Sequence, residues 1–153
     1  MSEIIELVFE EINIKSLDDI IMDISNAGSL IKKYSIKSDT EKREILSFKN
    51  PEEIQNIFDG KDGIALFINL TELNFDNIRI PNCMIRIISY DNKYDFEINF
   101  NNEDAILYDI ETLKKVLTTF SVNLANRYKI KKYYCGYEPA CDEENRLFTS
   151  NRY

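Results

Sequence analysis

The segment from residue 83 to residue 101 constrains the fold more than any other part of the chain. Two runs with alternating apolar and polar residues, Cys83–Tyr90 and Lys93–Asn101, are separated by the pair Asp91-Asn92. Strand-like alternation on both sides of such a pair is typical of a β-hairpin with a two-residue turn. The sequence therefore predicts an antiparallel hairpin here.

The pairing implied by this turn satisfies both faces of the hairpin at once. It places Ile87 opposite Phe96 on one face, and it continues that face with the pair formed by residues 85 and 98. On the other face it places Arg86 opposite Glu97, which is a favourable cross-strand charge pair. We expect one face to lie on the core and the other to meet water.

The rest of the chain adds further elements around this hairpin. Hydrophobic periodicity and capping residues predict strands at 3–10, 64–70 and 129–137, a possible short strand at 44–48, and helices at 16–34, 50–58 and 109–128. Ala27-Gly28 is a place where the first helix can bend or break. We expect loops at 34–50 and through Asn82. The fold class is α+β: one 1–153 domain with a single mixed or mainly antiparallel sheet of about five strands and two main helices packed on one face.

Composition excludes several classes of function. The 153 residues include 27 acids against 19 bases, for a net charge of -8, and no histidine. The acidic balance argues against general binding to nucleic acid or to an anionic membrane. The lack of histidine excludes Ser-His-Asp and Cys-His catalysis and histidine-ligated metals. We expect no catalytic residues, no cofactor and no metal, because no glycine-rich phosphate loop, calcium loop or zinc spacing is present either.

The cysteines and the hydropathy pattern bear on the compartment. Cys83, Cys135 and Cys141 make an odd number, which favours free thiols in a reducing cytoplasm over a disulfide scaffold. The first residues are acidic where a signal peptide needs basic ones. No apolar run approaches the roughly 18 residues that span a bilayer. A cytoplasmic protein is expected.

Charges of opposite sign are segregated along the chain. Residues 91–111 carry seven acids and one base, and residues 112–134 carry six bases and no acid. These clusters can be ordinary solvated faces. Alternatively, the acids and the tyrosines among them form a surface that recognises a basic protein. The candidate partner-binding residues are Asp95, Glu97, Glu103, Asp104, Tyr108, Tyr137, Asp142, Glu143 and Glu144.

The segment Gly136–Thr149, GYEPACDEENRLFT, is the least generic part of the sequence. It can act as a C-terminal lock, with Leu147 and Phe148 under the sheet and Arg146 paired internally, or it can present its acids to a partner. Together with the β-α-β-β-β-α-β plan, it resembles bacterial immunity proteins of polymorphic toxin and contact-dependent growth inhibition systems. The resemblance implies a stoichiometric, non-catalytic inhibitor bound to a cognate toxin domain, often a basic nuclease.

Two other functions remain compatible with the sequence. A small-molecule-binding or carboxylate-dependent enzyme would gather Asp95, Glu97, Asp104 and tyrosines in a deep pocket and raise their pKa values. A non-catalytic adaptor domain would act through self-association, for example along an edge strand. The leading hypothesis is a cytoplasmic immunity protein that occludes the active site or substrate surface of its toxin.

Overall fold

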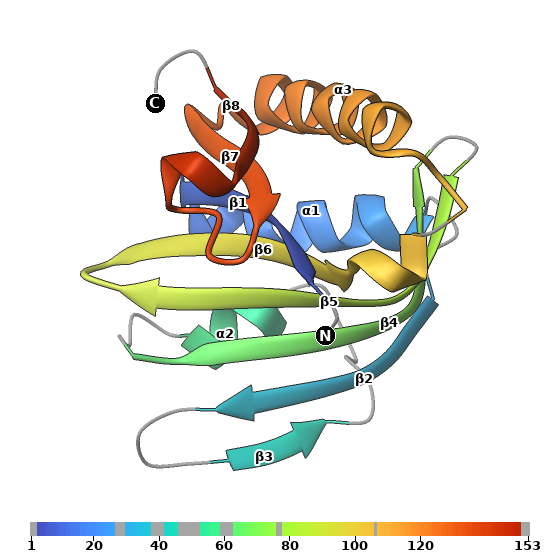
Figure 1. Ribbon diagram of the computed structural model, residues 1–153. Helices are drawn as coiled ribbons and strands as arrows, with labels where there is room; N and C mark the ends of the chain where they lie inside the picture. The colour runs from blue at the N-terminus through green and yellow to red at the C-terminus, as the bar shows by residue number, and fades with distance from the viewer. Residues whose placement is uncertain are drawn as a thin grey trace.

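An eight-stranded antiparallel sheet organises the molecule (Figure 1). The computed structural model describes residues 3–26, 30–37, 42–45, 53–58, 63–75, 78–105 and 107–150. The elements within these ranges, with η for 3-10 helix, are β1 (Ile4–Ile12), α1 (Ile14–Asn26), β2 (Leu30–Lys37), β3 (Lys42–Ile45), α2 (Glu53–Phe58), β4 (Ala65–Phe75), β5 (Ile78–Tyr90), β6 (Lys93–Asn101), η1 (Asn102–Ala105), α3 (Ile110–Tyr128), β7 (Lys132–Tyr137), η2 (Glu143–Asn145) and β8 (Arg146–Thr149). The strand order across the sheet is β3-β2-β4-β5-β6-β1-β7-β8.

One face of the sheet carries the hydrophobic core. Alternate residues of the central strands are buried on this face, among them Leu7, Phe96, Ile85 and Ile68. The helices add buried residues to the same cluster, namely Leu17, Ile20, Ile21 and Ile24 from α1, Phe58 from α2, and Leu113, Leu117 and Leu124 from α3. Each fully buried side chain of this kind contributes roughly 1.5–3 kcal/mol. The expected packing of the helices on one face is confirmed.

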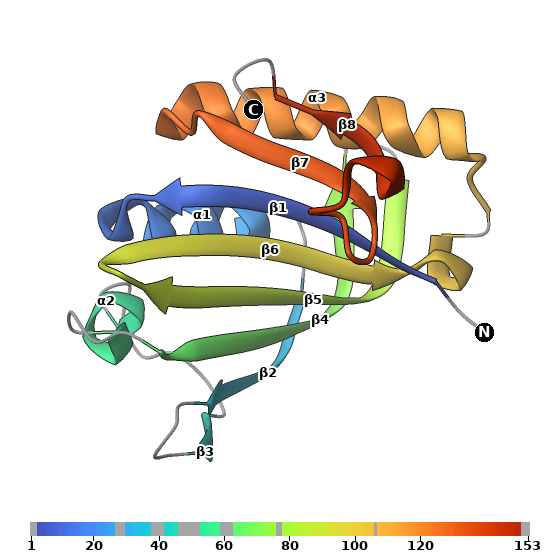
Figure 2. The ribbon, with the colours of Figure 1, turned by 60° about the vertical axis from the view of Figure 1, so that its left-hand side comes forward.

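The other face, which we call the open face, carries the polar residues of the same strands. Glu97 is paired with Val8 on β1 and with Arg86 on β5. The segment after β7 crosses this face in front of β1, while α1 and α3 lie behind the sheet (Figures 1 and 2). Its Ala140 packs with Val8 and Tyr134 in a small second cluster. The two faces thus differ as the alternation in the hairpin predicts.

The predicted hairpin register is confirmed at every pair. Ile87 pairs with Phe96, and Arg86 pairs with Glu97. The turn residues Asp91 and Asn92 have φ angles of 46° and 61°, as a two-residue turn of this twist requires. The helix predicted at 109–128 is also confirmed, because α3 spans Ile110–Tyr128 and the Asp109 side chain caps it through Thr112 N at 2.7 Å.

The strand count is higher than the expected five, and three predictions of extent are wrong. The helix predicted to residue 34 ends at Asn26, and β2 begins at Leu30, because the apolar residues that fit a helical period there pair with β4 instead. The segment predicted as a loop at 34–50, with a possible short strand at 44–48, contains the rest of β2 and the short strand β3, which overlaps that possible strand at residues 44 and 45. Residues 38–41 and 46–50 of this prediction lie outside the described residues. The loop predicted through Asn82 is largely a second hairpin, in which Leu73 pairs with Ile80 and both are buried. The tail ends in strand β8.

Candidate partner-binding surface

The direction of β6 separates the predicted acidic residues into distinct places. Asp95 lies near the start of this strand, and Glu103 and Asp104 lie in η1, just after its end. Asn101 lies six residue steps after Asp95, a distance of about 20 Å at the usual rise per residue. Asp95 and the acids of η1 therefore lie at opposite ends of β6.

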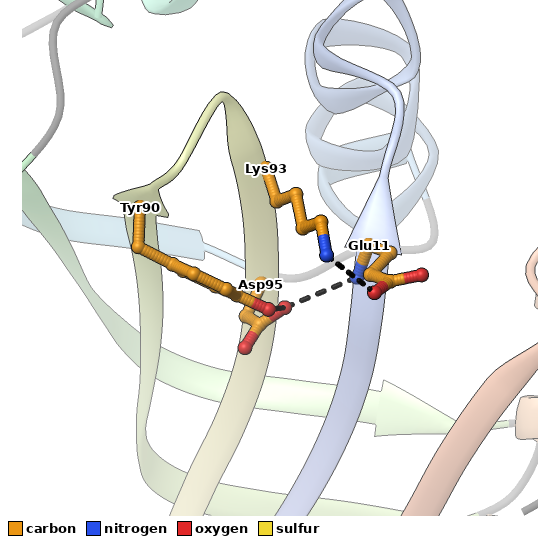
Figure 3. A network of polar contacts seen from close by, with 4 residues as sticks. All are labelled: Glu11, Tyr90, Lys93 and Asp95. Carbon is orange, nitrogen blue, oxygen red and sulfur yellow. Dashed lines mark hydrogen bonds and ion pairs between the residues drawn. The ribbon is translucent and has the colours of Figure 1, made fainter.

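At the start of β6, Asp95 is held by two hydrogen bonds (Figure 3). The Tyr90 hydroxyl donates to its Oδ1 at 2.8 Å, and the backbone N–H of Glu11 donates to the same oxygen at 3.1 Å. Glu11 has a φ angle of 55° and sits where the β1–β6 register shifts. Lys93 Nζ binds the Glu11 carboxylate at 3.1 Å. Asp95 thus stabilises an irregularity of β1.

The pKa values of this network follow from its partial burial. Burial raises the pKa of the Asp95 carboxyl above its ordinary value, although the hydrogen bonds from Glu11 and Tyr90 act in the opposite direction. Burial and the bond to Asp95 raise the pKa of the Tyr90 hydroxyl. Lys93 lowers the pKa of Glu11. The carboxylate of Asp95 is therefore engaged inside the molecule.

Glu97 is also engaged inside the molecule. Only 8% of the residue is exposed, and Arg86 Nε donates to its Oε2 at 2.8 Å. Burial raises the pKa of the Glu97 carboxyl despite the adjacent guanidinium. A charge with a bonded internal partner attracts an outside cation less strongly than a free one, because the two local charges cancel.

At the other end of β6, a pocket of about 250 Å³ opens between η1, the start of α3 and the end of β7. Its lining residues are Asn102, Glu103, Ala105, Tyr108, Ile110, Leu113 and Tyr137. The backbone N–H of Arg79 donates to the Tyr108 hydroxyl at 3.1 Å, which fixes that side chain. Two apolar side chains of the same segment face water, since Leu107 is 89% exposed and Ile110 is 37% exposed. We call the pocket formed by the seven lining residues the η1 pocket, and Leu107 is not one of those residues.

Asp104 does not line the η1 pocket. Burial and, to a lesser extent, the negative charge of Asp104 raise the pKa of the Cys83 thiol to about 12. Asp104 therefore lies near the buried Cys83 side chain. Cys83 and Cys135 are buried and Cys141 is exposed, and all three are free. The structure therefore brings Glu103, Tyr108 and Tyr137 together and leaves Asp104 beside them.

The acids of the tail lie in a third location, apart from the Asp95 network and from η1, on the segment that crosses the open face. Asp142, Glu143 and Glu144 are exposed in and before η2. Two side chains bind main-chain groups of this segment. The N–H of Ala140 donates to Glu6 Oε2 at 3.1 Å, and the Arg146 guanidinium donates to the carbonyls of residues 140 and 141 at 3.1 and 2.9 Å. The predicted internal pairing of Arg146 is confirmed.

The tail and the η1 pocket meet at one end of the sheet. Tyr137 lines the pocket, and the next residue, Glu138, donates its backbone N–H to the Ile4 carbonyl at 2.8 Å. Gly136 lets the tail return close to β7, because a Cβ there would lie 2.3 Å from the Asn145 carbonyl oxygen. Tyr137 thus links the η1 pocket to the tail, whereas α3 separates Glu103 and Tyr108 from the tail in the sequence.

Two features of the surface were not predicted from the sequence. Leu107 gave no signal, because a lone apolar residue between helices has no periodicity. A larger groove of about 470 Å³ lies between α1, β4 and α3, where Arg127 Nη1 binds Asp23 Oδ2 at 2.7 Å and the Tyr128 hydroxyl also bonds Asp23. Its residues come from three distant segments, so no local motif marks it.

The enzyme alternative requires a deep pocket that gathers several of Asp95, Glu97, Asp104 and the tyrosines. Neither of these two pockets is lined by Asp95, Glu97 or Asp104. Among the residues that the structure describes, no group of three or more histidines, cysteines or acids could hold a metal ion. Within the same ranges, no helix is long and apolar enough to cross a membrane.

Comparison with known proteins identifies the family. The model of the PABL017 Cdi1I immunity protein family matches residues 3–153. A chain of the crystal structure of the toxic C-terminal tip of CdiA from Pseudomonas aeruginosa in complex with immune protein is similar in fold, with a TM-score of 0.81, 21% identity, and coverage of 99% of this chain and 97% of that one. A search of curated proteins found no match. Because the family model covers nearly the whole sequence, the chain belongs to the PABL017 Cdi1I immunity protein family.

Proposed function

We propose that this protein binds a cognate toxin domain in the cytoplasm and neutralises it by covering its active site or its substrate surface. The observation that carries the proposal is the family match over residues 3–153. The structure described above is compatible with it, because Glu103 is exposed beside the partly buried tyrosines of the η1 pocket and the tail acids are exposed as well. A stoichiometric inhibitor needs such a surface and needs no catalytic group.

The partner is proposed to be basic, as a nuclease domain would be. The net charge of -8 and the exposed acids Asp142, Glu143 and Glu144 would attract it. Such attraction raises the rate of encounter and disfavours acidic competitors. Acids that replace substrate phosphates at the toxin would account for inhibition of a nuclease.

The predicted binding residues are proposed to contribute unequally. Glu103, Tyr108 and Tyr137 lie together around the η1 pocket and belong to the centre of the proposed surface. Asp95 and Glu97 already have internal partners at 2.8 Å. We therefore place them at its margin, where long-range charge matters more than direct contact.

Co-expression tests this function directly. Cells that express the toxin domain encoded next to this protein should survive when the protein is also made, and the two chains should co-purify in equal amounts. Phe96→Asp is the matched control, because it introduces a charge into the centre of the core and should abolish both protection and co-purification. A folded wild-type chain that neither protects nor co-purifies would overturn the proposal.

A further inference from the structure

The η1 pocket has the size of a site for one side chain. Its volume of about 250 Å³ is below the roughly 300–1,000 Å³ of pockets that bind small molecules. It lies at the surface between three elements, with Asn102 and Glu103 on η1, Ile110 on α3 and Tyr137 on β7. A side chain that extends from a docked protein surface can fill a pocket of this size.

The charge around the pocket selects a cation. Glu103 lines it, and Asp109 and Glu111 are exposed at the adjacent start of α3. Hydrogen bonds from Thr112 lower the pKa of the Asp109 carboxyl, so this group stays ionised and offsets the partial positive charge of the helix N-terminus. Arg79 is a cation of the neighbouring β5, and its side chain is not part of the lining.

The walls suit the apolar stem of a long cationic side chain. Tyr108 and Tyr137 supply two aromatic rings, and aromatic rings attract Arg and Lys head groups through cation–π contacts. Leu107, 89% exposed beside the pocket, offers apolar surface to residues next to that side chain. Tyrosine is one of the residue types enriched at the pocket positions that dominate binding energy at protein interfaces.

We propose that the η1 pocket receives one Arg or Lys side chain of the toxin domain, with Glu103 as its charge partner and Tyr108 and Tyr137 as its walls. The inference rests on the proposed function, because it names the contact that anchors the same complex. It commits the interface to the η1 end of the sheet and away from the Asp95 network.

A small probe tests the pocket without the toxin. Arginine amide, titrated at millimolar concentrations into the isotope-labelled protein, should shift the amide NMR signals of Glu103, Tyr108 and Tyr137 before others. Citrulline amide, which has a nearly identical shape and the same α-amino group but no charge on its side chain, should cause much smaller shifts, and Glu103→Gln should abolish the response to arginine amide. Equal responses to both probes, or shifts confined to other residues, would overturn the assignment.

The toxin complex tests whether the pocket is the anchor. Glu103→Gln should weaken toxin binding at least about tenfold, and Leu107→Ser should weaken it in the same direction. The control is Asp19→Asn, which removes an exposed acid on α1 and should change the dissociation constant less than about twofold.

The possible failures are distinguishable. If wild-type protein does not bind the toxin, the proposed function fails, and the arginine amide titration still decides whether the pocket takes a cation. If wild type binds and both pocket variants bind equally well with unchanged melting temperatures, the anchor is overturned and the proposed function stands.

Discussion

The guanidinium of Arg86 and the carboxylate of Glu97 lie opposite each other on the open face, with Nε donating to Oε2 at 2.8 Å. The side chain of Glu97 is 11% exposed and that of Arg86 is 34% exposed. The acid is therefore the more buried member of the pair. Removing its partner leaves a poorly solvated negative charge in the middle of the sheet.

Arg86→Met should destabilise the protein by about 1–3 kcal/mol, less than for a fully buried pair because Arg86 is partly solvated. Urea denaturation at neutral pH measures the change. The double variant Arg86→Met/Glu97→Met is the control, and it should recover much of the loss because no unpaired charge remains. Equal stability of the single variant and the wild type would show that the pair contributes nothing.

Asp95→Asn should change how stability depends on pH. Burial raises the pKa of the folded Asp95 carboxyl, so the folded state holds this proton more tightly than the unfolded state. Stability from this group is therefore fully present below the ordinary aspartate pKa and is lost as the pH rises through the folded value. The asparagine variant keeps an oxygen acceptor and loses this dependence.

Denaturation of the two proteins at a series of pH values checks this. The stability of Asp95→Asn relative to wild type should increase as the pH rises from acidic to neutral, and it should not decrease anywhere in that range. Glu11→Gln provides a contrast, because Lys93 lowers the pKa of Glu11 and its effect has the opposite sign. Parallel curves for wild type and Asp95→Asn would contradict the prediction.

Gly136→Ala should loosen the tail. A Cβ at this position would lie 2.3 Å from the Asn145 carbonyl oxygen, and backbone must move to admit it. We expect a loss of about 1–3 kcal/mol and faster amide hydrogen exchange across residues 138–150. Cys141→Ala, an exposed change in the same segment, is the control and should leave exchange unaltered. Unchanged exchange in Gly136→Ala would show that the close return of the tail is not required.

Reversing the charges of the tail should slow association with the toxin. In the triple variant Asp142→Lys, Glu143→Lys and Glu144→Lys, the association rate should fall about tenfold or more at low ionic strength. The difference should shrink as salt is added, because exposed charges are screened. Stopped-flow binding measures both, with Asp19→Lys as a single-charge control. A rate that is unchanged at low salt would place the encounter surface elsewhere.

The hairpin was predictable because one register satisfies two independent patterns. Only that alignment pairs Ile87 with Phe96 and Arg86 with Glu97 at once. The strand β2 was not predictable in the same way, since Leu30 and Ile31 fit a helical period equally well. What decides their conformation is the availability of β4 as a partner, which is a property of the whole sheet.

The candidate surface was predictable in its chemistry and not in its assembly. The sequence predicted that acids and tyrosines bind the partner, and Glu103, Tyr108 and Tyr137 were among the predicted residues. It could not show that β7 returns Tyr137 to the end of β6, because that contact joins residues far apart in the chain. Nor could the sequence show that the Tyr90 hydroxyl donates a hydrogen bond to the Asp95 carboxylate, since that bond depends on the orientation of both side chains in the folded hairpin.

The position of β1 in the middle of the sheet has a consequence for how the protein is made. Ile5 pairs with Phe100 on one side and with Tyr137 on the other. The two partners of β1 are thus synthesised much later than β1 itself, several seconds later at usual rates of translation. Until then its apolar residues have no sheet to join. Pairing of β1 on both of its sides therefore requires a chain that is complete through β7.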